Sequence, residues 1–206
     1  MKAAVLYEYG GPEKLRIEEI DEPVVEKSTD IKIKVLASSI NPVDWKIRIG
    51  NHKYTLGSHF PIILGFDACG EIVETGNEVT RFKVGDIVYG RLNRKYGRAY
   101  AEFAVASENV FDHKPQNISI EEAAASPLAA LTALQALRDK GNIKKDSSVL
   151  INGASGGVGC FAVQVAKLLG GECWAVASKR HFECLEKMNP DKLIDYTESD
   201  VCTLDK

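Results

Sequence analysis

The segment Val149–Gly159 places a short apolar strand, a glycine-rich turn and the start of a helix directly after one another. Val149–Ile151 is apolar and rich in β-branched residues, which is typical of a strand buried on both faces of a parallel sheet. Apolar residues at helical spacing follow the turn, and Gly170 and Gly171 end that pattern. The sequence therefore predicts a strand–turn–helix unit here.

The turn of this unit has the composition of a phosphate-binding loop. Its small residues let backbone N–H groups approach a pyrophosphate, and the helix N-terminus adds a partial positive charge. Against the pattern G-x-G-x-x-G, Gly156 and Gly159 match, Ala154 replaces the first glycine, and Gly153 lies just ahead. We predict dinucleotide binding, and an ordinary tight turn is the alternative. The expected contacts come from Ser155, Gly156, Gly157, Val158 and Gly159.

The next apolar segment, Glu172–Ala177, is expected to be the second strand, with the ribose-reading residue at its end. A site that prefers NAD carries Asp or Glu there, because a carboxylate binds the 2′-hydroxyl and repels a 2′-phosphate. This chain has Ser178, Lys179 and Arg180 instead. Two cations beside a hydroxyl favour a phosphate, so the sequence predicts NADP(H) as cofactor. A solvated basic turn is the alternative.

Composition limits the class of protein only broadly. The 206 residues are 45% hydrophobic and 27% charged, as in a soluble globular chain, and their formal net charge is −3. That charge argues against nucleic acid or an anionic membrane as the main partner. No membrane span or signal peptide is expected, and five scattered cysteines suggest reduced thiols. We expect a cytoplasmic protein with a small-molecule substrate, which could form a homo-oligomer.

The spacing of apolar residues changes once along the chain. Residues 1 to about 115 alternate with a period of two, which predicts a mostly antiparallel, barrel-like β domain. From Ser119 the pattern is helical: Ser119 and Glu122 form a capping box, and Pro127 is expected to end that helix. A second helix should run from about Leu128 to Lys140. We place the domain boundary near residue 125, giving domains 1–125 and 126–206. The expected strands of the first domain include Ile31–Val35, Ile62–Leu64, Cys69–Val73, Asp86–Tyr89 and Tyr100–Val105.

Several segments of the chain occur in an order that is characteristic of one superfamily. They are Asn41–Asp44, Leu64–Gly70, Val84–Val88, Pro127–Leu134 and Ala154–Gly159. In these segments the chain resembles the medium-chain dehydrogenase/reductase superfamily, most of all its quinone oxidoreductase and enone (alkenal) reductase branch. The resemblance implies an α/β protein with a β-rich N-terminal domain. That domain is a GroES-like barrel, and a Rossmann domain, a doubly wound parallel sheet, follows it with the substrate cleft between them.

Zinc, which the alcohol dehydrogenases of this superfamily bind, is not expected here. Their catalytic cysteine and histidine would fall near Ser38–Asn41 and at Phe66, and neither serine nor phenylalanine is a ligand in such sites. Their structural zinc needs four closely spaced cysteines, and residues 70–159 contain none. The four histidines have neither the mutual spacing nor the cysteine neighbours of a metal site. They are His52, His59, His113 and His181.

In a zinc-free reductase the cofactor supplies a hydride, and negative charge develops on the substrate oxygen. The resemblance places Asn41 near the nicotinamide as a neutral amide. Lys46, five residues on, could donate to the cofactor or to the developing enolate. Asp44 would orient its neighbours, and Tyr54 could be an outer proton donor. For Lys46 and Tyr54, a plain role on an exposed loop is the equal alternative.

The resemblance also implies contacts from Thr132 to the cofactor and from Tyr196 to the 2′-phosphate, beside Lys179. It implies that the family continues beyond Leu204–Lys206, so the Rossmann domain of this chain is incomplete. We therefore expect that residues 1–206 alone bind the adenosine part of the cofactor, hold the nicotinamide only loosely and show little turnover. Two other functions stay open: a non-catalytic NADPH-binding protein, and a zinc-free alcohol or acyl-chain reductase.

Overall fold

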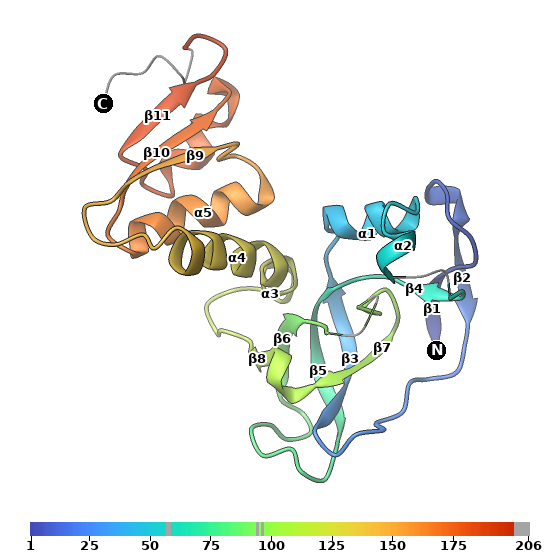
Figure 1. Cartoon of the computed structure of the whole chain (residues 1–206). Helices are drawn as coiled ribbons and strands as arrows, with labels where there is room; N and C mark the ends of the chain where they lie inside the picture. Colours follow the sequence, from blue (N-terminus) through green and yellow to red (C-terminus); the bar gives the residue numbers. More distant parts are fainter. Residues whose placement is uncertain (57–58, 94, 96, 200–206) are drawn as a thin grey trace. The chain divides into compact units, whose positions relative to one another are not determined.

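Alternating apolar and polar residues in the first part of the chain form antiparallel strands, and the helical part carries a small parallel sheet. The computed structural model describes residues 1–56, 59–93, 95 and 97–199, except for the side chains of residues 55 and 56 (Figure 1). The chain divides after Leu128 into two compact units. The division expected near residue 125 is at the last residue of helix α3. Leu204–Lys206, named above, and one of the five cysteines, Cys202, lie outside the described residues.

The larger sheet of the first unit has five strands in the order β7-β3-β5-β6-β8, and its neighbouring strands are antiparallel. Strand β3 shifts register twice against β5, between Lys32 and Ile33 and between Val35 and Ala37. Irregularities of this kind bend a sheet, as a barrel-like domain requires. The bounds are β3 (Asp30–Ser38), β5 (Asp67–Thr75), β6 (Ile87–Arg91), β7 (Phe103–Ser107) and β8 (Phe111–His113).

A second sheet in this unit has three strands in the order β2-β1-β4, again antiparallel. An isolated bridge joins Ala3 to Ala101. Short helices connect the strands. The bounds are β1 (Lys2–Leu6), the 3-10 turn η1 (Pro12–Lys14), β2 (Leu15–Glu19), α1 (Pro42–Arg48), α2 (Lys53–Leu56), β4 (Ile62–Ile63), η2 (Glu108–Val110) and α3 (Ile120–Ala125).

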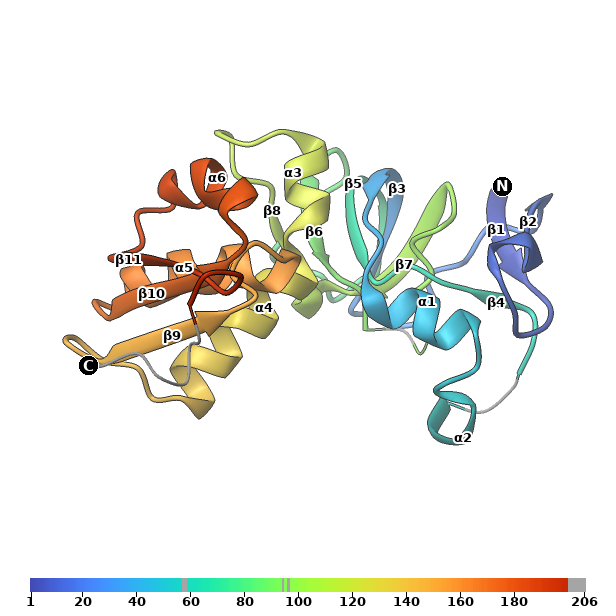
Figure 2. The ribbon, with the colours of Figure 1, turned by 90° about the horizontal axis from the view of Figure 1, so that it is seen from above.

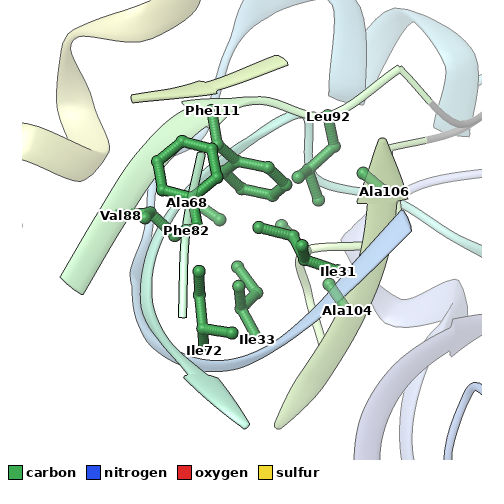
Figure 3. Packing of buried hydrophobic residues seen from close by; sticks show 11 residues of the cluster. Ile31, Ile33, Ala68, Ile72, Phe82, Val88, Leu92, Ala104, Ala106 and Phe111 are labelled. Atoms are coloured by element: carbon green, nitrogen blue, oxygen red, sulfur yellow. The ribbon is translucent and has the colours of Figure 1, made fainter. Parts of the chain in front are cut away.

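The core of the first unit lies on one face of the five-stranded sheet (Figure 3). Ile31, Ile33 and Ile72 have no exposed surface, and Phe82 and Phe111 cover them. Ile31 and Ile33 are two residues apart on β3, which matches the alternation of a half-buried strand. Burial of such side chains contributes roughly 1.5–3 kcal/mol each, so this face holds the sheet together.

The second unit is a parallel three-stranded sheet in the order β11-β10-β9, with its strands side by side in Figure 2. Helix α5 packs on β9 and β10, and its buried Val163 and Ala166 join the core of this unit. The bounds are β9 (Ser148–Asn152), α5 (Gly157–Leu168), β10 (Glu172–Ala177), η4 (Lys179–His181), α6 (Phe182–Glu186) and β11 (Lys192–Asp195).

The helical connection between the sheets differs in part from the prediction. The capping box is confirmed: Glu122 N–H donates to Ser119 Oγ at 3.1 Å, and Ser119 N–H donates to Glu122 Oε2 at 2.8 Å. The first helix ends at Ala125, with Ser126 as its C-cap directly before Pro127, and Pro127 also begins the next helix, α4 (Pro127–Leu134), since proline is well suited to a first turn. The expected single helix continues as a π-helix, Gln135–Lys140. No helix in the part of the chain that the structure describes is long and apolar enough to cross a bilayer.

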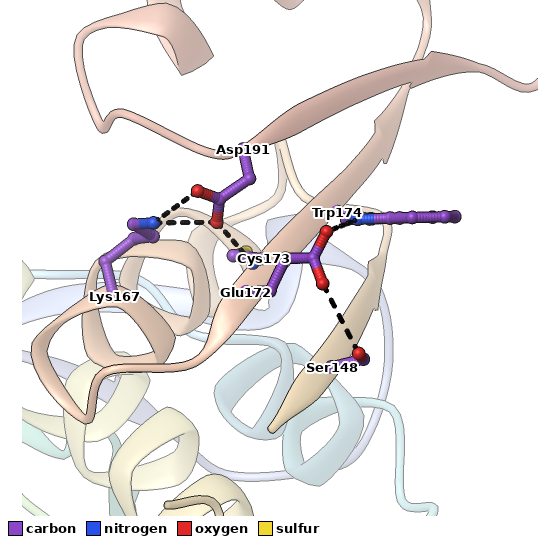
Figure 4. Close-up of polar contacts among 6 residues, drawn as sticks. All are labelled: Ser148, Lys167, Glu172, Cys173, Trp174 and Asp191. Atoms are coloured by element: carbon purple, nitrogen blue, oxygen red, sulfur yellow. Dashed lines mark hydrogen bonds and ion pairs between the residues drawn. The ribbon is translucent and has the colours of Figure 1, made fainter. Parts of the chain in front are cut away.

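Asp191 ties the second strand of the parallel sheet to helix α5 (Figure 4). Both its carboxylate oxygens lie 2.7 Å from Lys167 Nζ, and Oδ2 also accepts from the Cys173 N–H at 2.6 Å. These donors hold the pKa of Asp191 below its usual range, first through the bond from Lys167. Nearby, Glu172 accepts from Trp174 Nε1 at 3.0 Å.

We predict that Asp191→Asn lowers the free energy of unfolding by about 1 kcal/mol at neutral pH, a value discounted because the pair is partly exposed. Asp191 has a lowered folded-state pKa, so its contribution is present above the unfolded pKa and lost as pH falls through the folded pKa. Urea unfolding at neutral and acidic pH measures both. The gap between wild type and variant should narrow in acid, and a gap that stays constant would contradict this assignment.

Candidate functional site

The parallel register of the second unit brings three loops to one edge of the sheet. Val176 of β10 pairs with Asn152 of β9, and Ala177 pairs with Asp195 of β11. Each strand therefore ends at the same level, and the loop that follows it starts at the carboxyl edge. In open α/β sheets this edge is where ligands bind.

The glycine turn after β9 is shaped by two glycines with different tasks. Gly153 has φ +74°, a left-handed conformation that glycine adopts without a steric penalty. Ala154 is fully buried and its N–H donates to the Val176 carbonyl oxygen at 2.9 Å, which fastens the turn to β10. A Cβ on Gly159 would lie 2.2 Å from the Gly153 oxygen, so only glycine lets α5 start this close. Ala154 thus replaces the first glycine of the motif because Gly153 makes the turn.

The start of α5 has the features of a phosphate cradle. Gly156 is the N-cap, and a Cβ on Gly157 would meet no atom within 4 Å, so the outer side of the turn is open. The first N–H groups of a helix have no intrahelical acceptor and carry its positive dipole end. Ser155 is half-buried and Val158 is exposed in the same segment. The residues predicted here therefore fit a nucleotide pyrophosphate.

The loop after β10 carries the predicted cations at the same edge. Ser178 is the residue before the 3-10 turn η4, at its N-cap position, and Lys179 and Arg180 are exposed. Lys179 Nζ lies 4.0 Å from Glu198 Oε1, and Arg180 Nε donates to His181 Nε2 at 3.0 Å. The cations thus stand at the place where the sequence predicts a 2′-phosphate.

A residue that the sequence reasoning missed joins this loop to the loop after β11. Asp195 is buried, and its Oδ2 accepts from the Lys179 N–H at 3.2 Å. Its Oδ1 accepts from Thr197 N–H at 2.9 Å and from Thr197 Oγ1 at 2.7 Å, and these bonds lower the pKa of Asp195. Tyr196 follows directly and is 58% exposed, so its phenol is available at this edge. The only sequence signal was an aspartate at a strand end.

In the first unit, Asn41 belongs to a buried polar cluster. Its Nδ2 donates to Asp67 Oδ2 at 2.8 Å and lies 3.4 Å from Ser39 Oγ. Its backbone N–H donates to Asp44 Oδ2 at 2.7 Å, while Asp44 Oδ1 accepts from Gly65 N–H at 3.1 Å. Asp44 therefore orients its neighbours, as the sequence suggests, by joining the start of α1 to the loop before β5.

Asp67 is the second residue that sequence reasoning did not select. It has no exposed surface and accepts three hydrogen bonds: from Asn41, from Ser39 Oγ at 3.1 Å, and from Leu128 N–H at 3.0 Å. Burial raises the pKa of both Asp44 and Asp67, and the bonds they accept oppose that rise. Burial and these two carboxylates also raise the pKa of Tyr100, whose hydroxyl donates to the Ser39 carbonyl oxygen at 3.3 Å. A carboxylate at the head of an apolar strand was the available signal.

The structure does not bring the other predicted residues of the first unit into this cluster. Lys46 is exposed on α1, and its ammonium lies 5.6 Å from the centroid of the Trp45 ring. Tyr54 is 90% exposed on α2, and Lys53 Nζ lies 5.0 Å from its ring centroid. In the second unit, Thr132 is exposed on α4. All three side chains are exposed and therefore accessible to a ligand.

Other residue types stand where the zinc-dependent members of the superfamily carry their zinc ligands. Phe66 is buried, with the Arg91 guanidinium carbon 5.0 Å from its ring centroid, and Ser38 Oγ donates to the Asp67 carbonyl oxygen at 2.7 Å. Across residues 1–56, 59–93, 95 and 97–199, no group of three His, Cys, Asp or Glu side chains is arranged to hold a metal ion.

Known proteins with the same features were found by sequence and by structure. Residues 27–115 match the family described as the alcohol dehydrogenase GroES-like domain. The chain is 42% identical over 192 residues to the chloroplastic quinone-oxidoreductase homolog of Spinacia oleracea, covering 91% of this chain and 58% of that protein. The quinone oxidoreductase from Coxiella burnetii superposes with a TM-score of 0.88 at 35% identity, covering 100% of this chain and 66% of that one.

The Escherichia coli quinone oxidoreductase complexed with NADPH gives a TM-score of 0.83 at 30% identity, covering 98% of this chain and 60% of that one. The chain thus spans less than two thirds of the length of each of these relatives. The GroES-like match covers most of the antiparallel unit, and the expected fold class, with a partial Rossmann-like domain, is confirmed. The chain belongs to the medium-chain dehydrogenase/reductase superfamily, in its quinone and enone oxidoreductase branch.

Proposed function

We propose that the chain binds NADP(H) at the carboxyl edge of its parallel sheet and serves a zinc-free reductase of quinones or α,β-unsaturated carbonyls. The observation that carries this proposal is the convergence of three loops: the glycine turn, the loop of Ser178 and Lys179, and the loop of Tyr196. The first suits a pyrophosphate and the other two suit a phosphorylated ribose. Two relatives support a nicotinamide cofactor. One is named as an NAD(P)H oxidoreductase, and the other is the Escherichia coli quinone oxidoreductase whose structure contains NADPH.

The choice of NADP(H) over NAD(H) rests on charge at the end of β10. The two carboxylates in contact with Lys179 come from the end of β11 and the loop after it, and not from the end of β10, where an NAD-type acidic residue lies. Asp195 is buried and bonded to backbone N–H groups, and Glu198 lies across Lys179 on the following loop. The positive charges of Lys179 and Arg180 at the end of β10 therefore favour a 2′-phosphate.

When bound, the nicotinamide supplies the hydride, and the protein must hold both partners and stabilise negative charge on the substrate oxygen. The amide nitrogen of Asn41 already donates to Asp67, so the side chain is oriented and its oxygen is the group left to accept from a ligand. Lys46, exposed on α1, is the cationic donor we assign to the cofactor or the developing enolate. Tyr54 is the outer proton donor we would test next.

A non-catalytic NADPH-binding protein is the second candidate. The hydrogen bonds of the Asn41 amide favour it, because its two N–H groups already have Asp67 Oδ2 at 2.8 Å and Ser39 Oγ at 3.4 Å as acceptors and are therefore less available to an oxyanion. A zinc-free alcohol or acyl-chain reductase differs from the first candidate only in substrate. We also expect a reducing compartment such as the cytoplasm and a small-molecule substrate; the cysteines of the described residues are free thiols.

We predict that Lys179→Ala weakens NADPH binding about tenfold or more, the usual loss for one charge-assisted contact, while NADH binding is unchanged. Fluorescence titration of both nucleotides measures this, with Lys187→Ala on the same unit as a charge-matched control. Equal affinity of the wild type for NADPH and NADH would refute the assignment of this loop.

The purified chain should contain no stoichiometric zinc, and a chelator should leave its fold and its nucleotide affinity unchanged. The reason is that serine and phenylalanine stand where the superfamily's zinc enzymes carry their ligands. Elemental analysis and circular dichroism provide the measurements. One zinc ion per chain would overturn the zinc-free mechanism.

In a protein with the full length of its relatives, Asn41→Ala should lower quinone or enone turnover about five- to tenfold and weaken NADPH binding less. Loss of one hydrogen bond near the reacting atoms accounts for this magnitude. Steady-state kinetics and nucleotide titration give the two numbers, with the exposed Asn51→Ala as control. Tight NADPH binding without reduction of any quinone or enone would favour the non-catalytic candidate.

A further inference from the structure

Two loops at the nucleotide edge are linked through Asp195. Its carboxylate accepts from the backbone N–H of Lys179 at 3.2 Å and from Thr197 at 2.9 and 2.7 Å. The backbone of the Lys179 loop and the segment Tyr196–Glu198 are therefore held at a fixed separation. One side chain of the second loop reaches toward Lys179.

Glu198 is that side chain. Its Oε1 lies 4.0 Å from Lys179 Nζ, and the two side chains are 66% and 74% exposed. Pairs that are this exposed are weak and are exchanged easily for a better partner, because water screens them. The 2′-phosphate of a nucleotide carries more charge than a carboxylate, so it is the stronger partner for the same ammonium group.

We propose that Glu198 is a specificity-determining residue that competes with the 2′-phosphate for Lys179. In the free protein Glu198 lies at ion-pair distance from the ammonium group, and the phosphorylated ribose must displace it to bind. Glu198 therefore lowers the affinity for phosphorylated nucleotides and narrows the preference for NADP(H) over NAD(H). The inference rests on the proposed NADP(H) site.

Asp195 does not share this role. Its oxygens are bonded to groups of the backbone and to Thr197, and it is buried, so it positions the loops instead of facing the ligand. Arg180 adds positive charge to this loop, with its Nε donating to the ring of His181 at 3.0 Å. The proposed competition concerns the ion pair Lys179–Glu198.

The test uses residues 1–206 and two probes that need no nicotinamide: 2′,5′-ADP, which carries the phosphate, and 5′-AMP, which lacks it. Isothermal titration gives both affinities for wild type and for Glu198→Gln. We expect 2′,5′-ADP to bind about two- to fivefold more tightly to the variant, the range of one exposed ion pair, and 5′-AMP to bind equally to both. Glu186→Gln, an exposed residue of α6 with the same change in charge, should match the wild type.

The same measurements in a Lys179→Ala background separate competition from simple repulsion. If Glu198 acts through Lys179, Glu198→Gln has no effect on 2′,5′-ADP once Lys179 is absent. An equal gain with and without Lys179 overturns the proposal, and so does no gain in its presence. If the wild type binds 2′,5′-ADP no more tightly than 5′-AMP, the NADP(H) site itself fails and the inference falls with it. Circular dichroism melting confirms that each variant is folded.

Discussion

The parallel pairing of β9, β10 and β11 is the constraint on which the nucleotide edge depends. Backbone hydrogen bonds set Asn152, Val176 and Asp195 at neighbouring positions, and the three following loops therefore meet. Gly159 adds to this constraint, because its missing side chain lets α5 start directly against the turn. Without that close approach the positive end of the helix would lie farther from any phosphate.

Buried carboxylates position the loops of both units. In the first unit, Asp67 and Asp44 hold the segment around Asn41. In the second unit, Asp195 joins the loop of Lys179 to the loop of Thr197 at the nucleotide edge. Each carboxylate accepts two or three hydrogen bonds, which offset the cost of removing charge from water. These carboxylates act by orienting their neighbours, so we expect that their removal would affect a ligand indirectly, by moving the loops that contact it.

The proposed cofactor choice is a balance of charges and does not depend on a single residue. Lys179 and Arg180 favour a phosphate, while Glu198 offers Lys179 an internal partner. Exposed pairs contribute little to folding, and for the same reason they can adjust an affinity at little cost in stability. The GroES-like unit carries a separate polar cluster, and zinc-free chemistry there would depend on neutral and cationic donors.

The strand–turn–helix at Val149–Gly159, the capping box at Ser119 and each family signature could be predicted from the sequence, because each depends on residues close together in the chain. The sequence reasoning did not predict that Pro127 also begins the following helix, α4. Tertiary structure alone decided that Asp67 binds Asn41 and that Asp195 and Glu198 lie beside Lys179. These pairs are separated by 16 to 26 residues, and only the pairing of strands brings them into contact.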